Sequence, residues 1–144
     1  MNHSIGEAAK ASGVSAKMIR YYESIGLIEP ASRSAAGYRF YDDKDIQTLR
    51  FVRRARDLGF PVADIARLLE LWRDGSRSSA DVKRLAQGHI AALQERIEAL
   101  QAMRRTLEHL AGHCHGDQRP DCPILDDLAE GSDRPPTRPG RRIA

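Results

Sequence analysis

The chain contains two cysteines, Cys114 and Cys122, in a polar segment that reads His-Cys-His-Gly-Asp-Gln-Arg-Pro-Asp-Cys over residues 113–122. Two thiols in one segment can form a disulfide, act as a redox pair or bind a soft metal ion. The sequence shows no apolar stretch of membrane-spanning length and no secretory signal pattern, which predicts a cytoplasmic protein with no membrane partner. A structural disulfide is disfavoured in that reducing compartment, so metal binding and redox sensing remain.

Two histidines flank the first cysteine. His113 and His115 are either solvent-exposed side chains at a helix end, or one of them is a third metal ligand. A larger ligand set suits a divalent ion such as Zn(II) or Cd(II), whereas two thiolates alone satisfy a linear monovalent ion, Cu(I), Ag(I) or Au(I). Pro123 fits the first turn of a short helix through Leu128, which places Cys122 at the N-cap. The positive end of the helix dipole there favours a thiolate.

An enzyme that uses these thiols is not expected. A thiol oxidoreductase needs a C-x-x-C-like motif and a substrate cleft, and the sequence predicts neither. It also lacks a phosphate-binding glycine motif and a His-Glu-x-x-His metalloprotease motif. The cysteines are therefore interpreted as a binding or sensing site.

Positive charge is concentrated in the front of the chain. The formal net charge is +3, but residues 15–56 carry nine Lys and Arg against five Asp and Glu, whereas residues 113–144 carry five basic and six acidic residues. A basic front predicts an anionic partner, and nucleic acid is the first candidate.

The first 26 residues predict a helix-turn-helix. Ser4 and Glu7 have the spacing of a capping box at the start of a helix that Gly13 closes. Ser15 can cap a second helix that runs to about Ser24. Two short helices joined by a tight turn are typical of a DNA-binding helix-turn-helix, whose second helix enters the major groove.

The segment that follows predicts a small β-hairpin, or wing. Pro30 prevents a helix there, and residues 33–41 are aromatic-rich with Gly37 where a hairpin turns. A third helix, capped by Asp42 or Asp43, is expected to run to about Leu58. Pro61 suits the first turn of a fourth helix.

These elements carry side chains of the types that bind DNA. Arginine binds guanine edges and phosphates, and tyrosine hydroxyls can donate to phosphate oxygens. The candidate DNA contacts lie on the second helix, the wing and the third helix, and they are Lys17, Arg20, Tyr21, Arg33, Tyr38, Arg39, Tyr41 and Arg54. The neighbouring Arg50, Arg53 and Arg56 are expected to continue the basic surface.

The region from about residue 80 to residue 111 predicts one long helix with a dimerisation seam. It contains no proline and one glycine, and an apolar pattern repeats with alternating steps of four and three residues. The seam positions are Ala86, Ile90, Leu93, Ile97, Leu100, Arg104, Leu107 and Ala111. A second copy of the chain is the simplest partner for this stripe; the alternative is a helix folded back on its own domain.

The expected protein is therefore mainly α. It comprises a winged helix-turn-helix DNA-binding domain (1–75), a dimerisation helix (76–112), a metal-binding loop with a short helix (113–130) and a disordered tail (131–144).

Four segments carry a family pattern: Ala16-Lys17-Met18-Ile19-Arg20-Tyr21-Tyr22-Glu23, Gly26-Leu27-Ile28, Gly37-Tyr38-Arg39-Phe40-Tyr41 and Arg56-Asp57-Leu58-Gly59-Phe60. Together they resemble the MerR family of metal-responsive transcriptional regulators, over about residues 4–129. Around the cysteines, Gly116-Asp117 and Asp121-Cys122-Pro123-Ile124 resemble the copper-efflux regulator branch, of the CueR and HmrR type.

This resemblance implies a homodimer of winged-helix domains joined by an antiparallel coiled coil, with the cysteine loop as the effector site. It implies a transcriptional activator of metal-homeostasis genes that binds double-stranded promoter DNA and, with effector bound, bends and untwists it so that RNA polymerase can use it. The implied effector is Cu(I), or Ag(I) or Au(I), on Cys114 and Cys122. Divalent sensors of the family carry a cysteine where this chain has Ser79, and a hydroxyl is a poor ligand for a soft metal. The alternatives are a Zn(II) or Cd(II) sensor that adds His113 or His115, and a two-thiol redox-responsive regulator.

Overall fold

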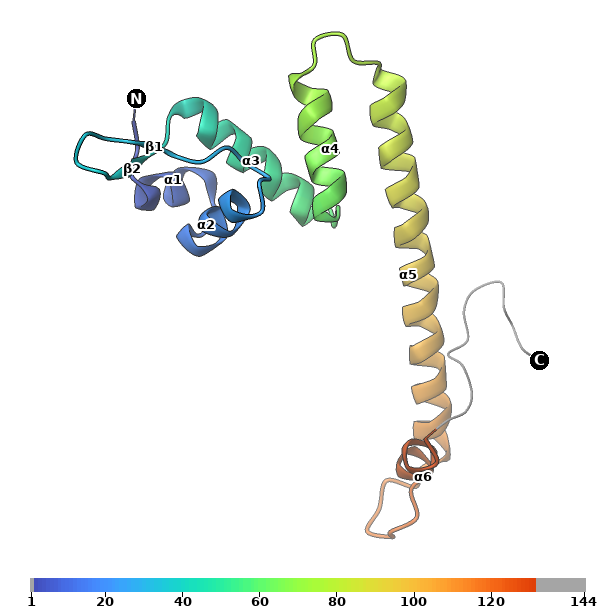
Figure 1. Cartoon of the computed structure of the whole chain (residues 1–144). Helices are drawn as coiled ribbons and strands as arrows, with labels where there is room; N and C mark the ends of the chain where they lie inside the picture. Colours follow the sequence, from blue (N-terminus) through green and yellow to red (C-terminus); the bar gives the residue numbers. More distant parts are fainter. Residues whose placement is uncertain (1, 132–144) are drawn as a thin grey trace. The chain divides into compact units, whose positions relative to one another are not determined.

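The computed structural model describes residues 2–131 of the chain, so the predicted tail, apart from Gly131, lies outside the described residues. The chain forms two compact units that divide between residues 85 and 86. The first unit contains α1 (Ile5–Ser12), α2 (Ala16–Ser24), β1 (Ser32–Arg33), β2 (Arg39–Phe40), α3 (Asp43–Asp57) and α4 (Val62–Arg73) (Figure 1). Most of α5 (Ser79–His113) and all of α6 (Pro123–Ala129) belong to the second unit. The mainly helical class is confirmed. Among the described residues, no helix is long and apolar enough to cross a membrane.

The helix-turn-helix is confirmed together with its caps. The Ser4 hydroxyl accepts from the backbone N–H of Glu7, and the Glu7 carboxylate accepts from the backbone N–H of Ser4. The Ser15 hydroxyl accepts from the backbone N–H of Met18 at the start of α2. Between the helices, Gly13 has φ 76°, a left-handed conformation in which a side chain is strained. These local signals fix where each helix begins and ends.

The wing is a short antiparallel hairpin in which Ser32 pairs with Phe40 and Arg33 with Arg39. Just after β2, the backbone of Tyr41 forms two hydrogen bonds of 2.7 Å with the backbone of His3. The wing is therefore joined to the segment that precedes α1, and the hairpin does not depend on its two strands alone.

The next two helices close the core of the first unit. Asp42 and Asp45 form a capping box at the start of α3, as predicted for Asp42. Pro61 lies one position earlier than predicted: it is the N-cap of α4, which begins at Val62. The largest fully buried side chains come from α2, β2 with its end, α3 and α4, and they are Ile19, Tyr41, Leu49, Val52, Ile65 and Leu69.

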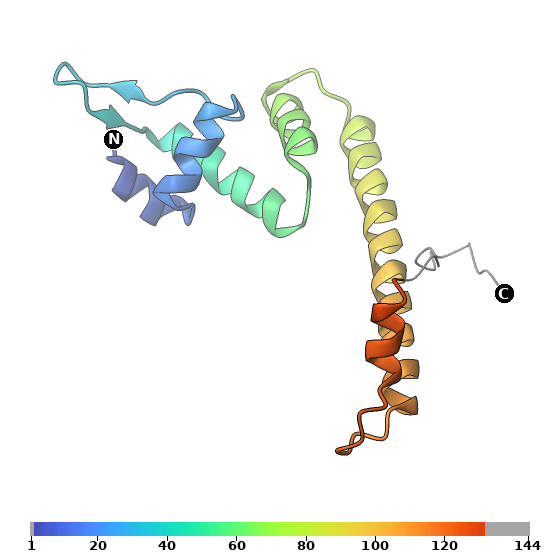
Figure 2. The same ribbon diagram turned by 60° about the horizontal axis from the view of Figure 1, so that its bottom comes forward.

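The second unit consists of the long helix and the loop that follows it. α5 has 35 residues, and its limits are within two residues of those predicted. α6 begins with Pro123 and has Cys122 as its N-cap, as predicted. In both views α6 lies alongside the C-terminal part of α5 (Figures 1 and 2). Several predicted seam residues of α5 are exposed in the single chain: Ile90, Ile97, Leu100 and Leu107.

The turn of the helix-turn-helix generates a stability prediction at Gly13. A Cβ at Gly13 would meet the Arg53 guanidinium, whereas a Cβ at Gly26, which has the same φ of 76°, would meet nothing. We expect both Gly13→Ala and Gly26→Ala to cost about 1–2 kcal/mol because of the left-handed backbone. Gly13→Ala should cost more, and Arg53→Ala should remove that excess in a double-mutant cycle measured by urea unfolding. Equal costs at both glycines would show that Arg53 does not constrain the turn.

Candidate nucleic-acid interface and thiol site

The exposed face of α2 carries three of the predicted DNA contacts. Lys17, Arg20 and Tyr21 are three and four residues apart, so they share one side of the helix. All three are exposed, and Tyr21 keeps 47% of its surface accessible, while Ile19 and Tyr22 are buried on the opposite side. Within residues 2–131, Lys17 and Arg20 have no ion-pair partner. The helix thus presents two uncompensated cations beside an aromatic ring.

The wing adds a second exposed group. The Tyr38 side chain is 75% exposed. The Arg33 Nη1 donates to the carbonyl of Gly37 at 2.9 Å across the hairpin, which holds the exposed guanidinium at the wing. Arg33 and Tyr38 therefore remain candidates for contacts to a phosphate backbone.

The prediction that Tyr41 lies on this surface is wrong. Its side chain is only 1% exposed, and its hydroxyl donates to Oε1 of Glu23 at 2.6 Å. Burial, followed by the hydrogen bond and charge of Glu23, raises the pKa of Tyr41 to about 12. Successive residues of a strand point to opposite faces, so Tyr38 and Tyr41, three positions apart, cannot both point outward. The alternation shows that only one of the two tyrosines can be exposed, and the contacts of Tyr41 with Glu23 and His3 decide which.

The Arg39 side chain also faces Glu23 rather than the surface proposed for DNA. It lies two positions from Tyr41 and so on the same side of the strand. Its Nη1 is 3.3 Å from Oε2 of Glu23, and its side chain is about one-third exposed. Glu23 of α2 thus contacts both Arg39 of β2 and Tyr41, which lies just after β2. Arg39 is better described as a residue that positions α2 against the wing than as a free DNA contact.

The arginines of α3 have different roles. Arg50 donates to the carbonyl of Ala11 at 3.0 Å, Arg56 donates to the hydroxyl of Tyr22 at 3.1 Å, and Arg53 lies 3.8 Å from Asp57. Arg54 is exposed and has no such partner in the part of the chain that the structure describes. Sequence analysis did not predict that Arg50 and Arg56 connect α3 to the helix-turn-helix, because the contacting residues are 39 and 34 positions apart along the chain.

The two thiols lie at opposite ends of the loop between α5 and α6. Cys114 directly follows α5, and its N–H donates to the carbonyl of Ala111 at 3.1 Å. Cys122 is the N-cap of α6, but its sulfur makes no cap hydrogen bond. Both cysteines are free and partly buried. Two accessible thiols without a competing partner suit a soft metal ion.

The loop itself is ordered by a local turn. Asp117 accepts from the N–H of Arg119 at 2.9 Å and from its guanidinium at 2.8 Å. Gly116 has φ 63°, so this position favours glycine. His113 and His115 are both exposed. Nowhere among residues 2–131 do three or more His, Cys, Asp and Glu side chains form a group that could hold a metal.

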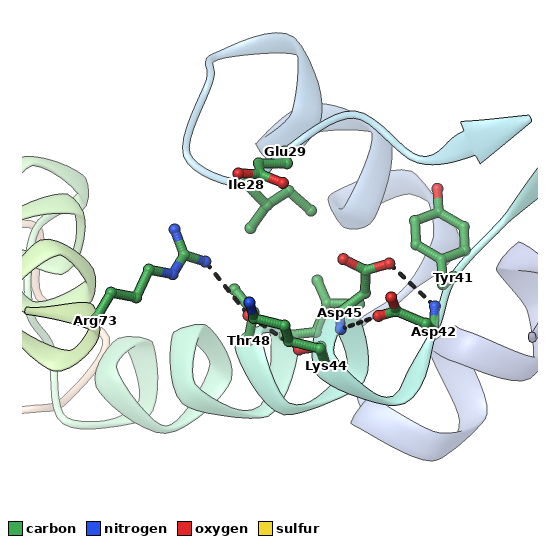
Figure 3. Close-up of a pocket in the computed structure, with 9 residues that line it drawn as sticks. Ile28, Glu29, Tyr41, Asp42, Lys44, Asp45, Thr48 and Arg73 are labelled. Carbon is green, nitrogen blue, oxygen red and sulfur yellow. Dashed lines mark hydrogen bonds between the residues drawn. The ribbon is translucent and has the colours of Figure 1, made fainter. Parts of the chain in front are cut away.

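A pocket of about 270 Å³ that the sequence did not predict lies between α3, the segment after α2 and the end of α4 (Figure 3). Its carboxylates serve the fold: Asp45 accepts from the N–H of Asp42 at 3.0 Å, and burial, with the nearby charges of Asp42 and Glu29, raises the pKa of Asp45. Arg73 reaches the Thr48 hydroxyl at 3.4 Å. The polar groups of the pocket are thus used to cap α3 and to connect it to α4.

The capped helix pair, the wing and the exposed cations of α2 define a winged helix-turn-helix protein of the DNA-binding class. Two family models match the chain: one described as MerR HTH family regulatory protein over residues 3–72 and one described as MerR, DNA binding over residues 46–110. The chain belongs to the MerR family of transcription regulators, whose members are not enzymes.

Individual proteins agree with this assignment. The chain is 66% identical to heavy metal-dependent transcription regulator 2 of Rhizobium meliloti (strain 1021), over 89% of this chain and 87% of that protein. It is 42% identical to the HTH-type transcriptional regulator CueR of Escherichia coli O6:H1, over 87% and 93% of the two chains. The crystal structure of the transcription regulator PbrR691 from Ralstonia metallidurans CH34 in complex with lead(II) is similar with a TM-score of 0.76 and 32% identity, covering 88% of this chain and 98% of that one.

The contact between Tyr41 and Glu23 generates a prediction about stability and pH. Tyr41→Phe should lower the free energy of unfolding by about 1–3 kcal/mol at neutral pH, because a buried hydrogen bond is lost. Since folding raises the tyrosine pKa from 10 to about 12, its contribution is fully present below pH 10 and is lost as the pH rises to 12. The difference between wild type and variant in urea unfolding should therefore shrink over that range. Tyr38→Phe, at an exposed position, is the control and should change little at any pH.

Proposed function

We propose that the chain is a metal-responsive transcription regulator in which Cu(I), or Ag(I) or Au(I), binds Cys114 and Cys122 and switches a promoter on. The observation that carries the proposal is the pair of free, partly buried thiols at the two ends of one ordered loop. The name of the Rhizobium meliloti relative supports dependence on a heavy metal. The similarity to CueR supports the copper-efflux branch that the loop sequence resembles.

The donor set favours a monovalent ion. Thiolates are soft ligands that select Cu(I), whereas a structural Zn(II) site requires four ligands. The described residues offer no group of three metal-binding side chains, and position 79, where divalent sensors of the family have a cysteine, is a serine. The lead(II) complex of PbrR691 shows that a relative binds a divalent ion, so Zn(II) or Cd(II) with an added histidine is the second candidate.

The DNA partner is double-stranded promoter DNA, which Lys17, Arg20 and Tyr21 of α2 contact in the major groove. Arg33 and Tyr38 of the wing and Arg54 of α3 contact the phosphates. Metal binding bends and untwists the bound promoter so that RNA polymerase can use it. Uncompensated, exposed cations on α2 support this assignment, because arginine and lysine dominate both guanine and phosphate recognition.

The active form is a homodimer joined through α5. In the single chain, Leu100 is 63% exposed, and Ile90, Ile97 and Leu107 on the same seam are also exposed. An apolar stripe of this length in water requires a partner, and a repeat of four and three residues is the pattern of a coiled coil. A second copy of α5 satisfies both requirements.

The DNA assignment predicts the effect of Arg20→Ala. Loss of a charged side chain from the groove-facing side of α2 should weaken operator binding by about 1–3 kcal/mol and leave the fold intact. Arg67→Ala is the matched control, because Arg67 is an exposed arginine of α4 outside the proposed interface. Fluorescence anisotropy at several salt concentrations measures both variants. Equal affinities for wild type and Arg20→Ala would remove Arg20 from the interface.

The effector assignment predicts that Cys114→Ser and Cys122→Ser each abolish nearly all of the transcriptional response to Cu(I) and Ag(I). Each thiolate supplies half of a two-ligand shell, so a single substitution is sufficient. His113→Ala and His115→Ala should keep the response. DNA binding without metal should persist in all four variants.

A promoter-reporter titration with Cu(I), Ag(I) and Zn(II) provides the measurement, and Ser79→Cys sharpens it. A thiol at position 79 adds a third soft ligand, so that variant should gain a response to Zn(II). If Zn(II) induces the wild type as well as Cu(I) does, or if His115→Ala is as inactive as Cys114→Ser, the divalent candidate replaces the monovalent one. A response to oxidant that needs both cysteines but no metal would favour a redox regulator.

A further inference from the structure

The last turn of α5 carries a pair of histidines, of which His109 has no part in the proposed function and His113 enters only its second candidate. His109 and His113 are four residues apart, and their ring centroids are 4.3 Å apart with the planes tilted by 49°. Both side chains are exposed. We propose that His109 and His113 form a second metal site, which takes a divalent transition-metal ion of the Ni(II), Cu(II) and Zn(II) class and is separate from the two thiols.

The spacing is that of a helical metal chelate. Histidines four residues apart lie on one face of a helix, which is how zinc-binding helices present two imidazoles to one ion. With metal–nitrogen bonds of ~2.0–2.1 Å, two imidazoles at roughly a right angle around an ion have their centroids about 4.5 Å apart. The observed separation of 4.3 Å is close to this value.

The hydrogen bonding of His113 also prepares it to be a ligand. Its Nδ1 is 2.8 Å from the carbonyl oxygen of His109. A carbonyl only accepts, so Nδ1 carries the proton and donates, and Nε2 of the neutral ring keeps its lone pair. Metal-binding histidines usually donate their second ring N–H to a carbonyl or a carboxylate, which fixes both tautomer and ring orientation.

The position on the helix favours a cation. His113 is the last residue of α5, where the unsatisfied carbonyls give the helix end a partial negative charge. Arg104 is paired with Glu108 at 3.0 Å. Arg105 lies one turn before His109 on the same face and is exposed, so one unpaired positive charge among the described residues lies a turn away from the histidine pair. An ion held between His109 and His113 would also cross-link the final turn of the helix.

The two sites differ in ligand chemistry. Imidazole is a borderline ligand that suits Ni(II), Cu(II) and Zn(II), whereas thiolates select softer ions such as Cu(I). The histidine pair supplies two protein ligands to the ion, and water completes the shell. Such a site remains when the thiols are removed.

The test is a Ni(II) titration of the full chain with both cysteines changed, Cys114→Ser/Cys122→Ser. The ring resonances of the five histidines report which side chains contact the paramagnetic ion. We expect the signals of His109 and His113 to broaden together, at about one ion per chain. In the same background, His109→Ala or His113→Ala should weaken binding at this site at least about tenfold. His115→Ala is the matched control and should change it by less than about twofold.

Two outcomes would overturn the proposal of a second metal site. Broadening of His113 that survives in His109→Ala would show that the two rings do not act together. Absence of broadening at His109 and His113 in the cysteine-free variant would exclude an independent imidazole site. Wild-type protein with its thiols alkylated by iodoacetamide provides a second background. Because this measurement uses protein without reactive thiols, its result is independent of whether Cu(I) is the effector.

Discussion

The geometry of the DNA-binding unit depends on one carboxylate. Glu23, near the end of α2, accepts a 2.6 Å hydrogen bond from Tyr41 and lies 3.3 Å from the guanidinium of Arg39. The backbone of Tyr41 pairs in turn with His3, before α1. α2, the wing and the segment before α1 are thus held through a single, largely buried junction. A neutral residue at position 23 would leave Arg39 as a half-buried cation without its ion-pair partner, which is costly.

Most of the fold could be predicted because its boundaries are set by local chemistry. The serine and aspartate caps and the glycine after α1 act within three or four residues, so the sequence alone located the ends of α1, α2 and α3 closely. The pairing of Tyr41 with His3 and the bond from Arg50 to Ala11 join residues that are far apart along the chain. No local pattern encodes them, and they decide which polar side chains are available for binding.

The candidate site residues also divide into those that a local pattern predicts and those that contacts far along the chain decide. Lys17, Arg20 and Tyr21 remain candidates because helical spacing alone predicts their shared exposed face. The prediction for Tyr41 was wrong because an aromatic residue of the wing was assigned to the surface by composition, whereas its contacts with Glu23 and His3 bury it. The two cysteines were easy to recognise because they are the chain's only thiols. The pairing of His109 with His113 was missed because His113 was considered only beside Cys114, and His109, four residues earlier on the helix, was not considered.

The long helix links the metal chemistry to assembly. Over its 35 residues, α5 buries only His89 and Ala102 within the single chain, which is too little to stabilise a helix about 50 Å long. In the proposed homodimer, a partner that covers the exposed apolar residues of α5 would supply the missing burial. Cys114 directly follows the last residue of α5, and the N–H of Cys114 donates to the helix carbonyl of Ala111. A loop attached in this way keeps its thiols positioned only while the last turns of α5 are formed. Association and metal binding should therefore stabilise each other, since each favours the same ordered helix end.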